Sequence, residues 1–532
     1  MMRTARATAL TVMFASLAAC AQLPQPAAHQ LFFRIAAGPA LHAPVSGRLL
    51  VFIAQGSGAK QVSIDEFHPA ATWVAAREVH DLAPGDTIEI DTDAIAYPKP
   101  FSSLAPGDYQ VQAVLDVDHT YNYSGLTPGD LITPVLTLKG WTPNKGPEPE
   151  LALSAAAAPA STRYTLTPED RQAASHLRLA AVQSVKLTRF WGRPTFIRAW
   201  VVLPPGYSKD PSHYYPTVYW THGFSGMLAG CQFMGAHLYE RMAAGKMPPM
   251  IWVMLDEHLP TGTHEFADSV NNGPWGSALT QEYIPWLESH YRMLSHARDR
   301  FLQGHSSGGW ATLQMQVNYP RVFGGTWSTS PDPSDFHDFT GINLYAPHAN
   351  VYHRADGTPY PLVRMQGNVI ATFEQFSRLE QVLGPYGGQM ASFDWVFSPR
   401  DQGGRPEPMF DRTTGDVDPK VVAYWSTHYD LAQIVRTTWA QRGPDLHGKI
   451  HVYVGTADTF FLDGAAHKFD AVLSQLGAGA HFTYRAGRSH FDLYGRADDR
   501  YALFDTIAAQ MYLTAYPHAA AKWQTLAAMS YP

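Results

Sequence analysis

Cysteine and charge are scarce in this sequence. Cys20 and Cys231 are the only cysteines among 532 residues, so at most one internal disulfide could form. Charged residues make up 16% of the chain, the net charge is −7, and no basic run occurs. This balance argues against nucleic acid as a partner. Apolar residues make up 45%, enough for a large core, so we expect two or three folded domains.

Long apolar runs are also scarce. Beyond the N-terminus, no stretch reaches the roughly 18 consecutive apolar residues that span a membrane. Two arginines and a short apolar run over residues 7–16 are typical of a secretory signal peptide, here 1–20. The stretch "LAAC", ending at Cys20, resembles a bacterial lipobox and implies that Cys20 is lipidated; the alternative is an ordinary signal peptide cleaved near "LAACA". The expectation is an exported lipoprotein, periplasmic or at the outer membrane, held there by its lipid alone. Cys231 then has no disulfide partner and should be a small buried side chain.

Residues 28–140 predict a β-sandwich domain. Runs such as "LFFRIAA", "GRLLVFIAQ" and "DYQVQAVLDV" have strand composition, and no convincing helix occurs among them. The turn sequences "LAPGD", found twice, and "LTPGD" separate strands. A β-propeller would need more chain. Residues 141–165 are rich in Pro, Ala and Gly, which predicts a linker.

Over residues 166–532 the pattern changes to strands alternating with helices. The runs "YPTVYWTHG" and "MIWVMLDE" are typical of strands buried in a parallel sheet, and "SGGWATLQMQVNYP" predicts a helix. Such alternation predicts a doubly wound, mostly parallel α/β domain. Residues 332–448 form a long insertion with helical patterns over 373–383 and after Asp418. We expect this insertion to form a lid or a pocket wall.

The stretch "FLQGHSSGGW" contains the best candidate for a nucleophile. A serine hydroxyl attacks only when a base takes its proton. One known arrangement places the serine on a tight strand-to-helix turn, with small residues two before and two after it. Gly304 and Gly308 satisfy this rule for Ser306, whereas His305 breaks it for Ser307. Ser306 is therefore the predicted nucleophile; the alternative is a glycine-rich turn without chemistry.

Attack on a carbonyl carbon leaves negative charge on its oxygen, which two backbone N–H groups typically stabilise. Ser307 is expected to supply one of them. The second should come from the loop after an earlier strand, and "VYWTHGFSG" offers the N–H of Phe224. His222 in that loop is expected to be structural.

A base and an acid should follow the serine, in the order serine, acid, histidine. His490 lies in a loop after the predicted strand "HFTYRAG", whereas His481 opens that strand and His467 lies in a predicted helix. Asp458 follows the apolar run in "KIHVYVGTAD". Its carboxylate is predicted to lie about 2.6–3.2 Å from one ring nitrogen of His490, with the other nitrogen facing Ser306.

Two other carboxylates remain as alternatives for the acid. Asp332 and Asp335 follow the strand after the nucleophile's helix, where some hydrolases place this group. A hydrogen bond between His490 and either of them, with Asp458 pointing to solvent, would refute Asp458 as the acid. Asp463 is more typical of a helix start, and Asp492 breaks the order.

Together these stretches resemble the bacterial putative-esterase family of α/β-hydrolases, which includes S-formylglutathione hydrolases, enterochelin esterases and feruloyl esterase modules. The resemblance covers about 185–332 and 449–495 and rests on "VVLPPGYSKDPSHYYPTVYWTHG", "NNGPWGSALTQEYIPWLESHYR", "FLQGHSSGGWATLQMQVNYPRVFGGTWSTSP", "VGTADTFFLDG" and "SHFDLYG". It implies an α/β-hydrolase fold, hydrolysis of carboxylic esters with neither metal nor organic cofactor, and Asp458 as the acid. It does not extend to the N-terminal domain or the insertion.

The sequence thus predicts a serine esterase acting on a small-molecule or polysaccharide-linked ester, with no nucleic acid partner. It does not specify the oligomeric state. An acyltransferase on the same scaffold is one alternative. A binding lipoprotein on an inactive hydrolase scaffold is another, and a prolyl-oligopeptidase-like peptidase is a third.

Overall fold

The computed structural model describes residues 30–65, 67–121, 126–127, 129–157, 166–384, 388–497 and 499–530. The predicted signal peptide, with Cys20, lies outside these residues. Within them, no helix is both long enough and apolar enough to cross a membrane.

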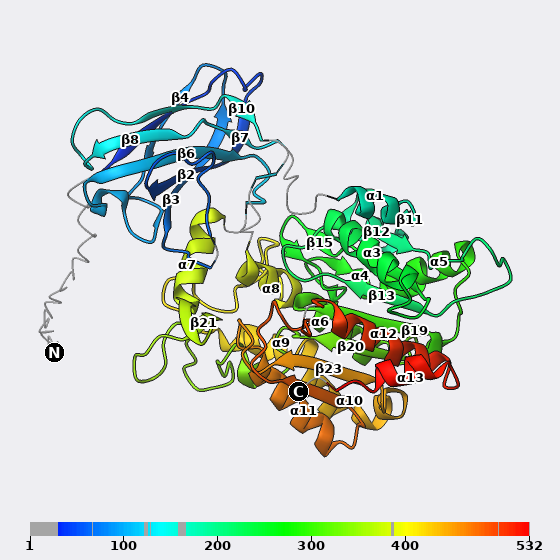
Figure 1. Ribbon diagram of the computed structural model, residues 1–532. Helices are drawn as coiled ribbons and strands as arrows, with labels where there is room; N and C mark the ends of the chain where they lie inside the picture. The colour runs from blue at the N-terminus through cyan, green and yellow to red at the C-terminus, as the bar shows by residue number, and fades with distance from the viewer. Residues whose placement is uncertain are drawn as a thin grey trace, which may run out of the picture.

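An eight-stranded sheet forms the centre of the α/β domain (Figure 1). In order across the sheet its strands are β11 (Leu177–Gln183), β12 (Phe196–Val202), β14 (Ile251–Leu255), β13 (Thr217–Thr221), β19 (Arg300–His305), β20 (Gly325–Thr329), β23 (Ile450–Gly455) and β24 (His481–Arg485). Strand β12 runs antiparallel to both of its neighbours, and the other neighbouring strands are parallel. The α/β-hydrolase fold predicted from the sequence is therefore confirmed.

Helices cover both faces of this sheet. One core joins it to α3 (Leu228–Ala243) and α12 (Ala502–Ala515), and includes Cys231, which is free and fully buried. The opposite face packs against α2 (Val185–Trp191), α4 (Trp275–Ala278), α5 (Ile284–His290) and α6 (Ser307–Asn318). A π-helical segment (Leu279–Tyr283) joins α4 to α5, and the remaining helices of this domain are α1 (Pro168–Ala174), α10 (Leu431–Leu446), α11 (Asp463–Gln475) and α13 (Ala521–Ala527). The strands of the central sheet, and the loops at their ends, are therefore held in place by helices on both faces.

The N-terminal β-domain consists of two sheets that share a core, as a sandwich does. The smaller sheet has the order β4 (Thr87–Asp91), β1 (Phe32–Ala36), β9 (Glu150–Ala152). The larger has the order β10 (Ala155–Ala156), β7 (Leu131–Ile132), β6 (Gly107–Asp116), β2 (Val45–Gln55), β3 (Thr72–Leu82), β5 (Ala96–Tyr97), with β8 (Leu136–Trp141) paired to β6. The sheet pairing is antiparallel except between β1 and β9.

The predicted linker, 141–165, differs from the structure over its first part. Strand β9 pairs with β1, and β10 pairs with β7, so residues 150–156 belong to the β-domain's sheets. Strand pairing uses backbone groups, which Ala-rich and Pro-rich composition does not reveal.

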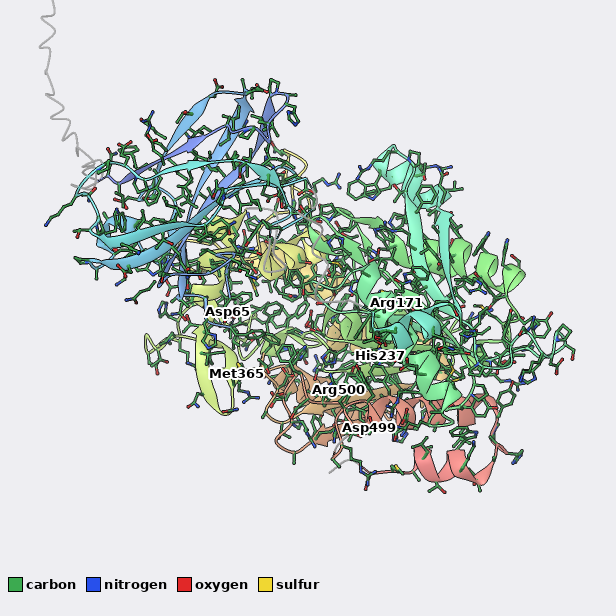
Figure 2. All side chains as sticks on the ribbon, turned by 45° about the horizontal axis from the view of Figure 1, so that its top comes forward. Asp65, Arg171, His237, Met365, Asp499 and Arg500 are labelled. Carbon is green, nitrogen blue, oxygen red and sulfur yellow. The ribbon has the colours of Figure 1, made fainter. Side chains whose placement is uncertain are left out.

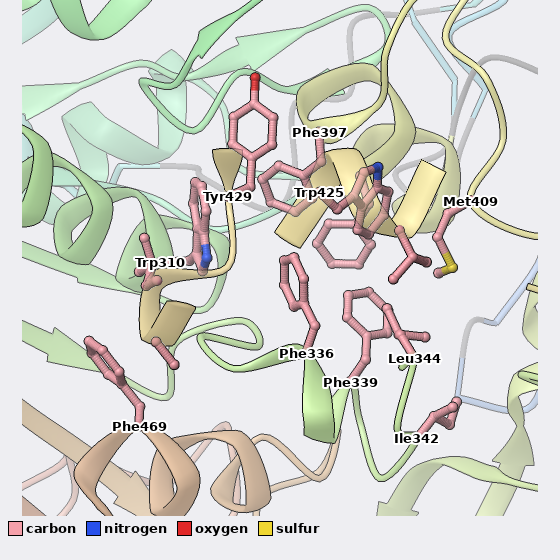
Figure 3. Close-up of a cluster of buried hydrophobic side chains, with 14 of the residues drawn as sticks. Trp310, Phe336, Phe339, Ile342, Leu344, Phe397, Met409, Trp425, Tyr429 and Phe469 are labelled. Atoms are coloured by element: carbon pink, nitrogen blue, oxygen red, sulfur yellow. The ribbon is translucent and has the colours of Figure 1, made fainter. Parts of the chain in front are cut away.

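The insertion brings its own core to the α/β domain. Besides α10, its α-helices are α7 (Phe373–Leu383), α8 (Gln389–Phe397) and α9 (Pro419–His428), with a hairpin of β21 (Pro361–Met365) and β22 (Asn368–Thr372). Asp418 caps α9, as its sequence predicts. Figure 3 shows Phe336, Phe397 and Trp425 of the insertion gathered with Trp310 of α6. The insertion is therefore anchored on the helix that follows Ser306.

Short strand pairs outside the insertion are β15 (His258–Leu259) with β16 (Gly262–Thr263), and β17 (Asp268–Ser269) with β18 (Gly273–Pro274).

Helix α7 joins the insertion to the β-domain (Figure 1, yellow against blue). Residues Leu49, Val51 and Ile53 of β2 face the sandwich core, and Leu50 and Phe52 face a second core. Three apolar residues of α7 complete that second core: Leu379, Val382 and Leu383. The continuous apolar run of β2 is explained by burial of both faces.

Candidate active site

Ser306 occupies the sharp turn between β19 and α6. Its backbone has φ +61° and ψ −127°, a conformation that non-glycine residues seldom adopt and that marks a strained, functional position. A Cβ on Gly304 would overlap the carbonyl oxygen of Gly308. A Cβ on Gly308 would lie 2.6 Å from the carbonyl oxygen of Thr221. The two flanking glycines are therefore required by close backbone approach, as the motif predicts.

The loop after β13 packs directly against this turn. A Cβ on Gly223 would lie 2.9 Å from the Cβ of Ser306, so only glycine allows the approach. Phe224 follows Gly223 in this loop and lines the same cavity as Ser306. Ser307 is the first residue of α6, and the N–H of a first helical residue has no partner within its helix. The two N–H groups predicted to bind an oxyanion thus belong to segments that meet at Ser306.

His490 and Asp458 are in direct contact. The Nδ1 of His490 lies 2.9 Å from Oδ2 of Asp458, and both side chains are buried. Asp458 follows β23, and its other oxygen accepts from the N–H of Phe460 at 2.9 Å. Burial alone would raise the pKa of Asp458, but the facing His490 and the Phe460 N–H hold it below its usual value. The pair therefore carries an ionised carboxylate that orients the imidazole.

The alternative acids are bonded to other groups, although Asp332 lines the same cavity as Ser306 and His490. Oδ2 of Asp332 accepts from the Ser307 hydroxyl at 2.6 Å, and its backbone N–H donates to Ser306 O at 3.2 Å. Burial raises the pKa of Asp332 to about 6, although the Ser307 hydroxyl acts in the opposite direction. Asp335 accepts from both the backbone and the ring of His337. Of these three acids, Asp458 alone is hydrogen-bonded to His490 in the described part of the chain.

Ser306 and His490 line one cavity, but no hydrogen bond joins them among the described residues. Such contacts are often long in unliganded enzymes and tighten when substrate binds. The neighbouring ring of His305 lies 4.3 Å from that of His490, centroid to centroid. Burial and the nearby His490 lower the pKa of His305 to about 3, so His305 stays neutral. The orientation predicted for the second ring nitrogen of His490 remains a prediction.

The cavity has a volume of about 420 Å³, within the range of sites that bind small molecules. It draws on three parts of the chain: the α/β domain, the insertion and the β-domain. Arg500, labelled in Figure 2, lies on its wall. Most of the wall is apolar, and seven phenylalanines contribute to it: Phe67, Phe224, Phe376, Phe393, Phe460, Phe491 and Phe504.

A buried acidic group behind the serine turn escaped the sequence analysis. Glu257 follows β14, is fully buried, and has no hydrogen-bond partner on either carboxylate oxygen within the described structure. His222 accepts from the backbone N–H of Glu257 at 3.0 Å, and its Nδ1 lies 2.8 Å from Gly223 O. His222 thus holds the loop of Phe224, the structural position expected for it. The signal in the sequence was an acid at the carboxyl end of an apolar strand, "MIWVMLDE".

Glu257 predicts a pH dependence of stability. Burial raises its pKa from 4.5 to about 8, so between these values the folded protein keeps a proton that the unfolded chain loses. The contribution of Glu257 to stability must therefore fall as the pH rises through this window. We expect Glu257→Gln to remove on the order of 2–3 kcal/mol of that fall between pH 5 and 7.5, measured by urea unfolding. The exposed Glu148→Gln serves as control and should keep the wild-type slope; an equal slope in Glu257→Gln would contradict the argument.

Comparisons with known proteins agree with this architecture. The sequence profile of the family described as "Putative esterase" matches residues 194–512, more than half of the chain. A search of curated proteins finds no significant match. Similar solved structures include a ferulic acid esterase (14% identity, 59% of this chain and 90% of that one, TM-score 0.36). They also include S-formylglutathione hydrolases from Agrobacterium tumefaciens (14%, 64% and 94%, TM-score 0.36) and Staphylococcus aureus (13%, 64% and 99%, TM-score 0.36).

The profile match begins just before β12 and ends within α12, so it contains Ser306, Asp458 and His490. The β-domain lies outside it. The chain belongs to the Putative esterase family of α/β-hydrolases.

Proposed function

We propose that this protein is a serine esterase whose nucleophile is Ser306, whose base is His490 and whose acid is Asp458. The observation that carries the proposal is the buried His490–Asp458 pair, 2.9 Å apart, whose histidine lies on the wall of the same cavity as the strained turn of Ser306. Membership of an esterase family supports ester hydrolysis. The residue roles are the proposal.

In this mechanism the Ser306 hydroxyl oxygen attacks the ester carbonyl carbon while His490 takes its proton. Asp458 stabilises the imidazolium and fixes its tautomer. The N–H groups of Ser307 and Phe224 hold the oxyanion, a contribution typically worth about 10²–10³ in rate for each donor. The C–O bond to the alcohol then breaks, and His490 protonates the departing oxygen. Water, deprotonated by His490, attacks the acyl-enzyme, releases the acid and restores Ser306.

Asp332 has a different place in this mechanism. Its carboxylate holds the Ser307 side chain and its backbone N–H holds the carbonyl of Ser306. It is therefore a positioning residue for the turn rather than the partner of the base.

Replacing His490 tests whether it is the base, and replacing His481, another histidine late in the chain, provides the comparison. With 4-nitrophenyl acetate as substrate, we expect His490→Gln to lower kcat/KM by about 10³-fold or more, because glutamine accepts no proton from Ser306. His481→Gln is the matched control: His481 is exposed on β24 and stacks on His451, so its rate should stay within about twofold of wild type.

A product analysis separates hydrolysis from acyl transfer. In the presence of an acceptor alcohol, a hydrolase should yield mainly the free acid, whereas a transferase should yield the new ester. Equal rates in the two histidine variants, or no turnover by the wild-type protein, would overturn the esterase proposal.

A further inference from the structure

We propose that the N-terminal β-domain selects the ester, because Phe67 forms part of the wall against which a bulky apolar group of the substrate packs. The inference rests on the proposed function and adds a specificity-determining residue from a segment that the family profile does not reach.

Phe67 stands at the end of an aromatic path that leads to the catalytic histidine. Its ring meets that of Phe491 edge-on, at 5.5 Å between centroids. Phe491 follows His490 in sequence and contacts Phe460 at 5.9 Å, and Phe460 contacts His490 at 5.0 Å. All four side chains line the cavity of Ser306. The β-domain therefore reaches the immediate surroundings of the reacting groups.

Phe491 shows where the substrate group would lie. Its side chain lines the cavity and is nevertheless 62% exposed. Large apolar side chains that gather at an open surface mark binding sites. A substrate group lying against the exposed part of Phe491 and the adjoining edge of Phe67 would cover both rings, and aromatic pairs of this kind add to simple burial.

The loop that carries Phe67 is held by hydrogen bonds within itself and to the β-sheet. Asp65 accepts from the N–H of Phe67 at 2.9 Å and contacts His68 Nδ1 at 2.8 Å. Earlier in the loop, the N–H of Val62 donates to the side chain of Gln112 on β6 at 2.9 Å. Figure 2 shows Asp65 on the side of the β-domain that faces the rest of the molecule. The sheet thus presents Phe67 in a defined position.

The β-domain also supports the part of the wall that the insertion supplies. Arg48 of β2 donates to the last carbonyls of α7, those of Val382 at 2.9 Å and Gln381 at 3.1 Å. Glu380 of α7 in turn accepts from the N–H of Met390 at 3.0 Å, in the first turn of α8. Met390 lines the cavity, as does Phe376 of α7. One rigid connection therefore runs from the β-sheet to the insertion's side of the site.

The composition of the wall indicates the substrate class. An ester with an acyl or alcohol group that is bulky and apolar would bury aromatic surface on three sides, whereas an acetyl ester of a small alcohol would not reach Phe67. We therefore expect the wild-type protein to prefer bulky apolar esters, with selection concentrated at Phe67 and Phe491.

The experiment compares ester series in the full-length protein. Phe67→Ala should lower kcat/KM for 4-nitrophenyl 3-phenylpropanoate, or for 1-naphthyl acetate, by about 10-fold, and should leave that for ethyl acetate, whose acyl and alcohol groups are both small, within about twofold. The series that responds identifies whether the acyl or the alcohol group meets Phe67. Phe67→Leu should retain most of the preference, because it keeps an apolar side chain at this position. Phe196→Ala is the matched control, since Phe196 is 44% exposed on β12 and does not line the cavity.

Two outcomes would overturn the inference. An equal loss on small and bulky esters would show that Phe67 only supports the fold. Unchanged rates on both bulky esters would show that the β-domain does not meet the substrate. Failure of the esterase proposal itself is distinguishable, because the wild-type protein would then show no His490-dependent turnover of any ester.

Discussion

Ser306→Ala is expected to abolish covalent labelling by a fluorophosphonate probe and to lower kcat/KM by on the order of 10⁵–10⁶-fold. The hydroxyl that this change removes is the only one placed on the strained turn, at φ +61°. No neighbouring group of the turn can replace it, because Ser307 is already the first residue of α6 and its hydroxyl donates to Asp332.

Ser307→Ala is the matched variant. It keeps the backbone N–H proposed for the oxyanion and loses the hydrogen bond to Asp332 and a longer one from Gln389, so labelling should persist and kcat/KM should fall by less than about 10-fold. Intact-mass measurement after labelling decides between the two serines. Labelling that survives in Ser306→Ala and disappears in Ser307→Ala would refute the assignment of the nucleophile.

Asp458→Asn is expected to lower kcat by about 10⁴-fold. The amide can still occupy the 2.9 Å contact with His490, but it carries no charge to stabilise the imidazolium and can hold the ring in the wrong tautomer. Asp332→Asn tests the competing acid. It should cost less than about 10-fold, because Asp332 is bonded to Ser307 and not to His490.

The kcat values of Asp458→Asn and Asp332→Asn are measured with one ester at one pH, and circular dichroism confirms that both variants fold. A larger loss in Asp332→Asn than in Asp458→Asn would exchange the roles of the two carboxylates. Similar losses in both would mean that the acid's function is shared.

Much of the α/β domain could be predicted from local signals. Strands β13, β14 and β23 are short apolar runs because both faces of the sheet are covered, and such runs need no long-range information to be recognised. Strand β3 was missed. Its second half, "REVHDL", is rich in charge and has only Val79 and Leu82 buried, so its pairing with β2 depends on partners distant in sequence.

Some features of the candidate site could likewise be predicted from the sequence, and others could not. The turn of Ser306 follows from glycine spacing, and the contact of Asp458 with His490 from strand order, so both were predictable. Phe67 in the cavity was not, because more than 400 residues separate it from Phe491 and only the packing of α7 on the β-sheet brings them together. The unpaired Glu257 depends equally on burial that no local pattern specifies.

The second core of the β-domain has a consequence for the order of synthesis. Leu50 and Phe52 emerge from the ribosome more than 300 residues before Leu379 and Val382, which cover them. At roughly 5–20 residues per second, that apolar face would wait for on the order of 15–60 s for its partner helix. The sandwich can close early, but its outer sheet face stays unfinished until most of the α/β domain has been made. A newly made chain therefore carries an exposed apolar sheet face for much of its translation, a situation in which protection by chaperones has its greatest effect.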